Sequence, residues 1–312
     1  MPGEIARCIL ADGAARLIVA LTTPAAEEAA RRHQSEGAAA LALARGTTAG
    51  LLLSTLTKDE ERVTLQVLGD GPLGGLTVDA SSSGRVRAYL RHAGSRLPAL
   101  RAATAIAPQR LSLAAAVGRG GIVHVVRDLG LRDTFSGETQ IVSGEIDDDV
   151  EHYLIASEQI DSALACDGLL DGVVVGSGGI AISGGVLIQA LPGSAGAEIV
   201  ASARERLRAG SLTRALETRP ATAEELVEAA LGDVLPALQV LDRRAVSFFC
   251  PCSRDRAASS LTLLGASELR SMILDEGKAE VTCNFCRERY EFDEVELEAI
   301  RREATPPSGP PS

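Results

Sequence analysis

The sequence predicts an α+β fold in three parts: a mixed sheet-and-helix domain, a helical linker and a small cysteine-containing module. Strand-like and helix-like runs alternate over residues 1–193 without a regular βαβ period, which favours α+β over α/β. After Pro192-Gly193 the segments become charged and helix-forming, and four of the six cysteines lie close together near the C-terminal end. We expect a core domain at 1–193, a linker at 194–245, the cysteine module at 246–303 and a disordered tail at 304–312.

The composition indicates a globular protein that binds neither nucleic acid nor membranes. The chain has 312 residues, 46% of them hydrophobic, and a mean hydropathy of +0.12. Its net charge of −11 repels phosphate backbones. No run approaches the ~18 uncharged apolar residues of a membrane span, and residues 1–12, which include Glu4 and Arg7, lack the apolar core of a secretion signal. We therefore expect a cytoplasmic protein, whose cysteines serve more often as ligands, core residues or redox sensors than in permanent disulfides.

Two apolar runs open the core domain, at residues 5–10 and 15–21, and the Ala-Asp-Gly-Ala between them predicts a hairpin. A helix is expected from Pro24 to His33, with Thr23 as its N-cap. Further strands are expected at residues 62–68, 75–80, 84–90, 121–127, 172–176, 179–182 and 185–191, and further helices at 37–57 (buried), 98–117 and 147–166.

The linker contains two charged helical segments, at residues 197–208 and 222–231. In the second segment a narrow apolar stripe lies opposite three glutamates. The simpler interpretation is that this helix packs on the body of the protein. The alternative is a surface that binds other proteins and is covered in one state. The stripe consists of Leu226, Val227, Ala230 and Leu231.

Local signals divide the C-terminal module into short elements. Serine N-caps and terminal glycines predict two helices, which a hairpin and a capped final helix follow. The expected elements are a helix from Ser253 to before Gly265, a helix from Ser267 to before Gly277, a hairpin of residues 278–283 and 287–292, and a helix from the Asp293–Glu296 capping box to about Glu303.

The cysteines of the module form a Cys-X-Cys pair, Cys250 and Cys252, and a Cys-X-X-Cys pair, Cys283 and Cys286. Four thiolates in two close pairs are what a tetrahedral structural zinc requires, with Zn–S near ~2.3 Å and no open position. A thiolate is also the form that reacts with oxidants. On spacing alone a purely structural zinc is the more common outcome, and a redox switch is the alternative. A thioredoxin-like couple is not supported, because residues 287–292 look like a strand and not a helix.

Two arguments favour the switch. A disulfide between Cys250 and Cys252 would join residues only two apart, near the upper end of the ~4.4–6.8 Å Cα range, and Pro251 restricts the backbone further. Such a bond would be strained and easily reduced, which suits a reversible sensor. In addition, a module of about sixty residues gains only ~3–5 kcal/mol from its own core, whereas a structural zinc contributes ~10–16 kcal/mol. Oxidation that ejects zinc should therefore unfold residues 246–303.

Other motifs have ordinary explanations. The run Gly69-Asp-Gly-Pro-Leu-Gly74 matches a dinucleotide-binding fingerprint, but a second strand follows it where that site requires a helix, so we interpret it as a hairpin turn. The run Gly176-Ser-Gly-Gly179 is interpreted in the same way. Cys8 and Cys166 lie in apolar segments and are expected in the core. The four histidines are scattered and are expected to be surface or core residues: His33, His92, His124 and His152.

Several segments together resemble a known family. The patterns Cys250-Pro-Cys-Ser-Arg-Asp-Arg256, Val281-Thr-Cys-Asn-Phe-Cys286 and Tyr290-x-Phe-Asp293 resemble the heat-shock protein 33 family (33-kDa chaperonin), which are redox-regulated holdases. The likeness extends over nearly the whole chain. It includes Leu65–Gly75, Asp128–Leu131, Ser136-Gly137, Val142–Glu145, Ser157–Gln159 and Gly184–Pro192.

The resemblance implies a cytoplasmic, ATP-independent chaperone with no enzymatic turnover. In the family the reduced form binds one Zn²⁺ through all four cysteines and is inactive. Oxidants together with unfolding stress drive disulfides that correspond here to Cys250–Cys252 and Cys283–Cys286. Zinc then leaves, the module and linker unfold, and apolar surface binds unfolding client proteins. Activation is commonly accompanied by formation of a homodimer.

The main rival is a zinc-ribbon protein that binds nucleic acid. Five of the eight aromatic residues lie near the cysteines, where they could stack on bases. However, residues 243–303 hold ten Arg/Lys against twelve Asp/Glu, a net charge of −2, where a basic face is expected. A zinc hydrolase is disfavoured because four cysteine ligands leave no open position on the metal. The aromatics are Phe248, Phe249, Phe285, Tyr290 and Phe292.

Overall fold

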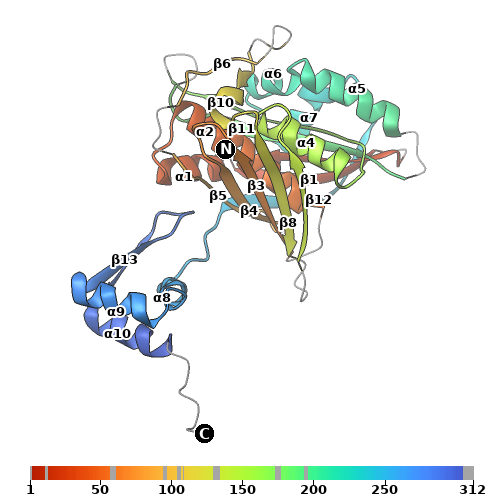
Figure 1. Ribbon diagram of the computed structural model, residues 1–312. Helices are drawn as coiled ribbons and strands as arrows, with labels where there is room; N and C mark the ends of the chain where they lie inside the picture. The colour runs from red at the N-terminus through yellow and green to blue at the C-terminus, as the bar shows by residue number, and fades with distance from the viewer. Residues whose placement is uncertain are drawn as a thin grey trace. The chain divides into compact units, whose positions relative to one another are not determined.

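The computed structural model describes residues 2–10, 13–56, 61–93, 97–103, 107, 109–128, 134–172, 177–192 and 196–304. By its internal contacts the chain divides into two compact units, Met1–Phe249 and Cys250–Ser312. Figure 1 shows the strands and helices of both units. The division into a core domain, a linker and a cysteine module stays a prediction from the sequence. Within the fold, the helices and strand of residues 196–248 belong to the first unit.

Among the described residues, ten strands of the first unit form one sheet in the order β10-β11-β2-β1-β12-β5-β4-β3-β8-β9. Neighbouring strands are antiparallel except β12 and β5, which run parallel and pair only at Ser247–Arg85 and Phe248–Val86. The sheet therefore consists of two antiparallel halves joined by the last residues of β12. The strands are β1 Gly3–Leu10, β2 Ala15–Leu21, β3 Arg62–Gly69, β4 Leu76–Ser81, β5 Arg85–Leu90, β8 Gly121–Asp128, β9 Phe135–Gln140, β10 Ser162–Leu170, β11 Ile180–Ala190 and β12 Leu238–Phe248.

Helices cover both faces of the half that contains β1, β2, β10 and β11. In β2, Ile18 and Ala20 face a core that includes α1 and α2, whereas Leu17, Val19 and Leu21 face a second core with α5, α6 and α7. Because both faces are buried, these strands are mostly apolar and show no regular polar alternation. The helices are α1 Thr23–Arg32, α2 Gly37–Ser54, α3 Ala114–Val117, α4 Ile146–Ala156, α5 Gly196–Arg208, α6 Ser211–Glu217 and α7 Ala223–Leu231.

Helix α2 is the central helix of the first core. Its close packing depends on glycine: a Cβ on Gly46 would lie 2.2 Å from a Leu76 methyl carbon, and one on Gly50 would lie 2.6 Å from Val78. The sequence-based statement that no run approaches a membrane span needs correction, because α2 is long and apolar enough by length and composition. However, 94% of this segment is buried inside the fold, as in the core helix of a globular protein.

Many predicted elements are confirmed. The hairpin of β1 and β2 is antiparallel, and the expected strands at 62–68, 75–80, 84–90 and 121–127 correspond to β3, β4, β5 and β8. Helices α1, α2, α5 and α7 lie where they were expected. The N-cap of α1 is Thr22 instead of Thr23, and its hydroxyl contacts Thr48 and Ser183 instead of capping the helix.

Other predictions were wrong, mainly where tertiary contacts override local propensity. Of residues 98–117, those that the structure describes (all but 104–106 and 108) are helical only at α3, which follows the short strands β6 (Arg101–Ala102) and β7 (Leu111–Ser112). The expected helix at 147–166 ends at Ala156, because the apolar residues that follow form β10, which is buried on both faces. The two strands expected at 179–182 and 185–191 are the single strand β11. Of the strand expected at 172–176, residues 173–176 lie outside the described residues. Strand β9, helix α6 and strand β12 were not predicted.

The second unit is a small module in which the described residues form one antiparallel hairpin and three helices. Strands β13 and β14 form the expected antiparallel hairpin, Ser253 caps α8 through the Arg256 amide, and Asp293 and Glu296 form the expected capping box. Helix α9 begins after Gly265, so the prediction of Ser267 as its N-cap was wrong. The expected tail falls almost entirely on residues 305–312, which are not described. The elements are α8 Arg254–Thr262, α9 Ala266–Asp275, β13 Lys278–Thr282, β14 Arg289–Asp293 and α10 Glu294–Glu303.

Candidate metal centre

Four cysteines of the second unit, here called the cysteine cluster, come from two places in the chain. One pair follows strand β12 and leads directly into α8. The other pair lies in the turn between β13 and β14, where the Cys283 amide donates to the Glu288 carbonyl at 2.9 Å and the Arg287 amide donates to the Cys283 carbonyl at 2.9 Å. Local backbone therefore positions the second pair independently of its side chains. The cluster consists of Cys250, Cys252, Cys283 and Cys286.

The sulfur atoms of the cluster converge. All four Sγ atoms lie within 4.8 Å of one another. The Sγ atoms of Cys250 and Cys283 are 3.7 Å apart, and those of Cys252 and Cys286 are 3.1 Å apart. A tetrahedral zinc with bonds of ~2.3 Å places its sulfur ligands about 3.8 Å from each other. The spacing and the donor set therefore fit a tetrahedral metal ion such as zinc, and the cluster could hold one.

Three of the four cysteines are half-buried, and Cys286 is buried. Burial raises the pKa of the Cys283 and Cys286 thiols above the ordinary range. The bare thiols therefore keep their protons at neutral pH, and binding of a metal must displace them. The Tyr290 hydroxyl donates to Cys252 Sγ at 3.3 Å. Such a hydrogen bond orients a sulfur ligand and stabilises its negative charge.

Little else holds the second unit together. Arg254 lies 4.6 Å from the Phe292 ring centroid and pairs with Glu296 at 2.7 Å, but both side chains of this pair are largely exposed. Among the described residues the apolar core is small, so a metal ion held by the cluster would be a major constraint on the module. The buried core residues are Ala257, Leu261, Leu269, Ala279, Phe292, Leu297 and Ile300.

Comparison with known proteins identifies the family. The family model described as Hsp33 protein matches residues 3–293. The chain belongs to the Hsp33 family. The 33 kDa chaperonin of Gloeothece citriformis is 39% identical over 320 residues, which cover 99% of this chain and all of that protein. The 33 kDa chaperonin of Bacillus subtilis is 35% identical over 302 residues, 96% of this chain and 99% of that one.

The fold agrees with this assignment. The crystal structure of the 33 kDa chaperonin (heat shock protein 33 homolog) from Thermotoga maritima matches with a TM-score of 0.77 at 27% identity. The match covers 97% of this chain and 99% of that chain. Membership of the Hsp33 family supports a chaperone function.

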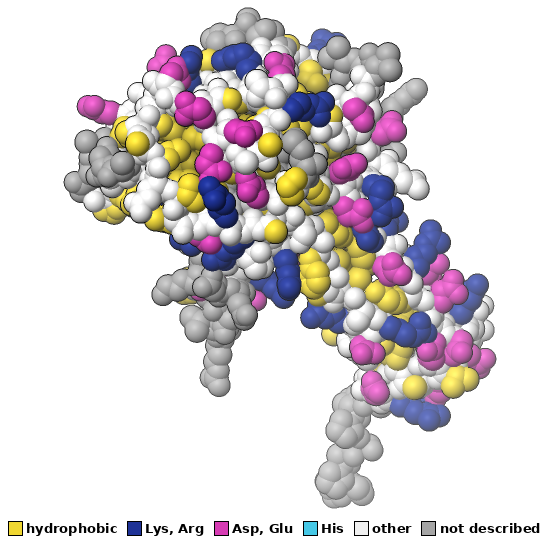
Figure 2. Space-filling view, turned by 180° about the vertical axis from the view of Figure 1, so that it is seen from behind, with side chains coloured by type: hydrophobic (Ala, Val, Ile, Leu, Met, Phe, Trp, Pro, Cys, Tyr) yellow, Lys and Arg dark blue, Asp and Glu magenta, His cyan; other side chains and the backbone are white. Residues whose placement is uncertain are grey.

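A nucleic-acid-binding role is not favoured for this Hsp33 protein. On the face drawn in Figure 2, basic and acidic side chains are interspersed, without the broad basic surface that phosphate backbones require. Among the aromatic residues considered for base stacking, Phe292 is 2% exposed and belongs to the module core. Phe248 packs against the core of the first unit, with Arg32 5.2 Å from its ring centroid.

The remaining candidates from the sequence lie apart from the cysteine cluster. The glycine run at 69–74 connects β3 to β4 without a helix, as expected for a hairpin turn. Cys8 in β1 and Cys166 in β10 are buried core residues, as predicted. Burial raises the pKa of the Cys8 thiol to about 11 and that of Cys166 well above its ordinary range, so neither is a reactive thiolate at neutral pH.

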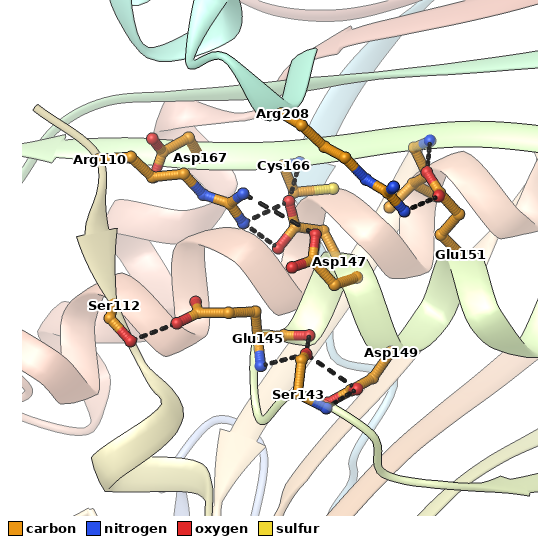
Figure 3. Close-up of polar contacts among 12 residues, drawn as sticks. Arg110, Ser112, Ser143, Glu145, Asp147, Asp149, Glu151, Cys166, Asp167 and Arg208 are labelled. Atoms are coloured by element: carbon orange, nitrogen blue, oxygen red, sulfur yellow. Dashed lines mark hydrogen bonds and ion pairs between the residues drawn. The ribbon is translucent and has the colours of Figure 1, made fainter. Parts of the chain in front are cut away.

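Sequence reasoning missed a buried ionic network in the first unit of this Hsp33 protein. Arg45, the one charged residue of α2, is fully buried. Its guanidinium donates to Glu145 at 2.6 Å and to Asp167 at 2.8 and 3.1 Å. Close by, Arg110 donates twice to Asp147, at 2.6 and 2.8 Å, as Figure 3 shows. The signal in the sequence that could have revealed this network was a single arginine in an otherwise uncharged, apolar helix.

The helices of residues 196–231 join this network. Thr213 of α6 donates to Asp167 at 2.6 Å. Arg208, at the end of α5, donates to Glu151 of α4 at 3.1 Å (Figure 3). The apolar stripe of α7 is also buried against the sheet, which agrees with the simpler interpretation of that helix. The segment expected to be a linker is therefore held on the sheet by buried polar as well as apolar contacts.

Proposed function

We propose that this protein is a redox-regulated, ATP-independent holdase: a cytoplasmic chaperone that binds unfolding proteins and prevents their aggregation under oxidative stress. It has no catalytic turnover. The observation that carries the proposal is the convergence of four cysteine sulfurs within 4.8 Å in a module with a small apolar core. Family membership supports the chaperone part of the proposal, and the chemistry of the cluster supports the regulation.

In the reduced, inactive state, Cys250, Cys252, Cys283 and Cys286 hold one zinc ion as thiolates. When bound, zinc supplies a tetrahedral cross-link between the two pairs and offsets the repulsion of four negative charges. The protein contributes the geometry. The β13–β14 turn presents one pair, the start of α8 presents the other, and Tyr290 donates to Cys252.

Oxidation removes the ligands. With hydrogen peroxide, each pair of thiolates gives up two electrons and forms one disulfide, and one peroxide takes up these electrons and two protons from solvent to become two waters, so two peroxides oxidise the whole cluster. We propose the pairings Cys250–Cys252 and Cys283–Cys286. Disulfide sulfurs no longer serve as thiolate ligands, so the module loses the constraint on which its fold depends, since its own core supplies only ~3–5 kcal/mol.

Unfolding of the module then acts on the segment before it. Phe248, the last residue of β12, lies two residues from Cys250, so unfolding that spreads along the chain from the module reaches this strand first. Release of α5, α6 and α7 would uncover the sheet face that they now bury, which includes Leu17, Val19 and Val186. This apolar face binds clients, and the activated form is a homodimer.

The proposal is tested by following metal and client together. Zinc-loaded protein is incubated with peroxide at raised temperature, and zinc release is recorded alongside the aggregation of an unfolding test protein. We expect zinc release to coincide with suppressed aggregation, and Cys166→Ala to behave like the parent because Cys166 lies outside both the cluster and the face that α5, α6 and α7 cover. Zinc release with unchanged client aggregation would show that the protein is not a holdase.

The disulfide pairing has its own test. Trypsin releases one pair within residues 245–254 and the other within residues 279–287. Disulfides within the pairs leave these two peptides separate, each lighter by two hydrogen atoms. A disulfide between the pairs joins them into one species, which mass spectrometry would detect and which would overturn the proposed pairing.

A further inference from the structure

Strand β12 covers one edge of strand β1 along its whole length. The two strands pair antiparallel from Gly3–Val246 to Leu10–Leu238, and β2 pairs with the other edge of β1. On its outer side β12 pairs with β5 only through Ser247 and Phe248; among the described residues no strand pairs with the outer edge of residues 238–246. Over most of its length β12 is therefore the outermost strand of its half of the sheet (Figure 1).

The side chains of β12 are only partly buried. Val246 is its one fully buried residue, whereas Leu238 and Val240 are half-buried against the second core and Phe248 against the first. Arg244 donates to the Ser82 carbonyl at 2.7 Å. Leu241, where the register with β1 shifts, is 58% exposed. The ion pair of Arg243 with Glu224 lies at the surface, with 57% and 32% of the two side chains exposed, so it contributes little. Main-chain pairing with β1 is the attachment that runs along the strand from Leu238 to Val246.

The two strands differ in how they would behave as free edges. The outer edge of β12 carries Asp242, Arg243 and Arg244 next to an irregularity in register, features that discourage pairing with another chain. Strand β1 has buried apolar side chains on both faces, such as Ile5 and Ala6, and its single central charge is Arg7. Once uncovered, β1 would present unpaired amides and carbonyls flanked by apolar surface, which is a template for strand addition.

We infer that β12 is a displaceable guard strand and that, in the oxidised form, the edge of β1 binds an extended apolar segment of an unfolding protein as an added antiparallel strand. The inference rests on the proposed function and assigns it a mode of client binding. Phe248 is joined to the cysteine cluster through Phe249 alone, so β12 is the element of the first unit that is nearest in the chain to the module that unfolds. The edge of β1 that β12 now covers is here called the slot. Because β12 fills it now, the segment that binds there should resemble β12 in form, with about eight extended residues and no proline.

Hydrogen exchange of residues 3–10 reports on the slot directly. We expect protection in the reduced protein, at least about tenfold faster exchange after oxidation, and renewed protection when a client is added. If the oxidised protein suppresses aggregation while residues 3–10 stay unprotected by client, strand addition is wrong and the holdase function stands. If it neither suppresses aggregation nor binds client, the proposed function itself fails. Protection that appears without client, in step with dimerisation, assigns the slot to a second copy and overturns the inference.

A matched pair of variants opens the slot without oxidation. Val246→Ser removes the one buried side chain of β12, whereas Ala245→Ser makes a comparable change at the exposed neighbouring position. The probe is a labelled peptide with the sequence of residues 238–248. Under reducing conditions we expect V246S to bind it at least about tenfold more tightly than A245S does. Equal binding by the two variants contradicts the inference.

The unmodified protein provides the same measurement if V246S does not fold. The oxidised form should bind the peptide of residues 238–248, the reduced form should not, and added client should compete. A scrambled peptide of the same composition that binds equally well would show general apolar adhesion and overturn strand addition.

Discussion

Thr213 of α6 donates a 2.6 Å hydrogen bond to Asp167 of β10, and both residues are 2% exposed. The other carboxylate oxygen of Asp167 accepts from Arg45, which is fully buried. The helix layer of residues 196–231 is thus tied to a charge in the centre of the first unit. If these helices leave the sheet, water reaches the Asp167 carboxylate and can hydrogen-bond to it. The free-energy cost of breaking its hydrogen bond with Thr213 is then smaller. The contact therefore specifies the docked position of α6 more than it resists its release.

We expect Thr213→Val to loosen α6 while preserving the shape of the side chain. The change leaves one Asp167 oxygen without this partner in a buried site, and the expected loss of stability is ~1–3 kcal/mol. Urea unfolding measures it. Thr218→Val is the control, since the exposed Thr218 hydroxyl bonds only within its own helix, to the Ala215 carbonyl at 2.7 Å. Equal effects of the two changes would show that the Asp167 contact contributes nothing to stability.

Asp148 predicts a pH dependence of folding stability. Burial and the neighbouring Asp147 raise the pKa of Asp148 to about 7, above the ~3.9 of an unfolded aspartate. The folded protein therefore binds more protons than the unfolded chain between about pH 4 and 7, and the contribution of this group to stability falls as pH rises through that range. Asp148→Asn should flatten this fall and make the protein more stable than the parent at pH 8.

The control for Asp148 is Glu198→Gln. Both acids lie in the first turn of a helix of the first unit, so both changes lose a similar helix-dipole interaction. Glu198 is exposed and should give no gain in stability at pH 8. Urea midpoints measured from pH 4 to 8 test the comparison, and parallel curves for D148N and the parent would rule out the assigned role of Asp148.

The sequence could predict the second unit almost residue by residue because its determinants are local. The Ser253 cap, the Asp293–Glu296 capping box and the two cysteine pairs all act over a few residues. Strand β12 could not be found in the same way, since its partner β1 is more than two hundred residues away and its centre is charged. The ionic network was hidden for the same reason: Arg45 and Asp167 are 122 residues apart in the chain.

Metal removal should unfold the second unit and leave the sheet of the first unit intact. The apolar core of the second unit contributes only ~3–5 kcal/mol to its folding, whereas a structural zinc contributes ~10–16 kcal/mol. We expect chelation to broaden or collapse the amide spectrum of residues 250–304 and to speed trypsin cleavage after Arg254 and Arg256, because helix α8 no longer holds the backbone there. Cleavage within the sheet is the internal control and should not increase. A stripped and oxidised module that keeps its amide dispersion would contradict the switch.

Tyr290 should tune how firmly the cluster retains metal. Its hydroxyl donates to Cys252 Sγ at 3.3 Å, and loss of such a supporting hydrogen bond typically lowers metal affinity by about 10–100-fold. Tyr290→Phe keeps the ring and removes only this donor, so zinc should transfer to a competing chelator at lower chelator concentration. Without the hydrogen bond the Cys252 sulfur is also the better nucleophile, so peroxide should oxidise the cluster faster. Tyr89→Phe, in β5 of the other unit, should change neither quantity; if the two variants behave alike, the hydroxyl does not act on the cluster.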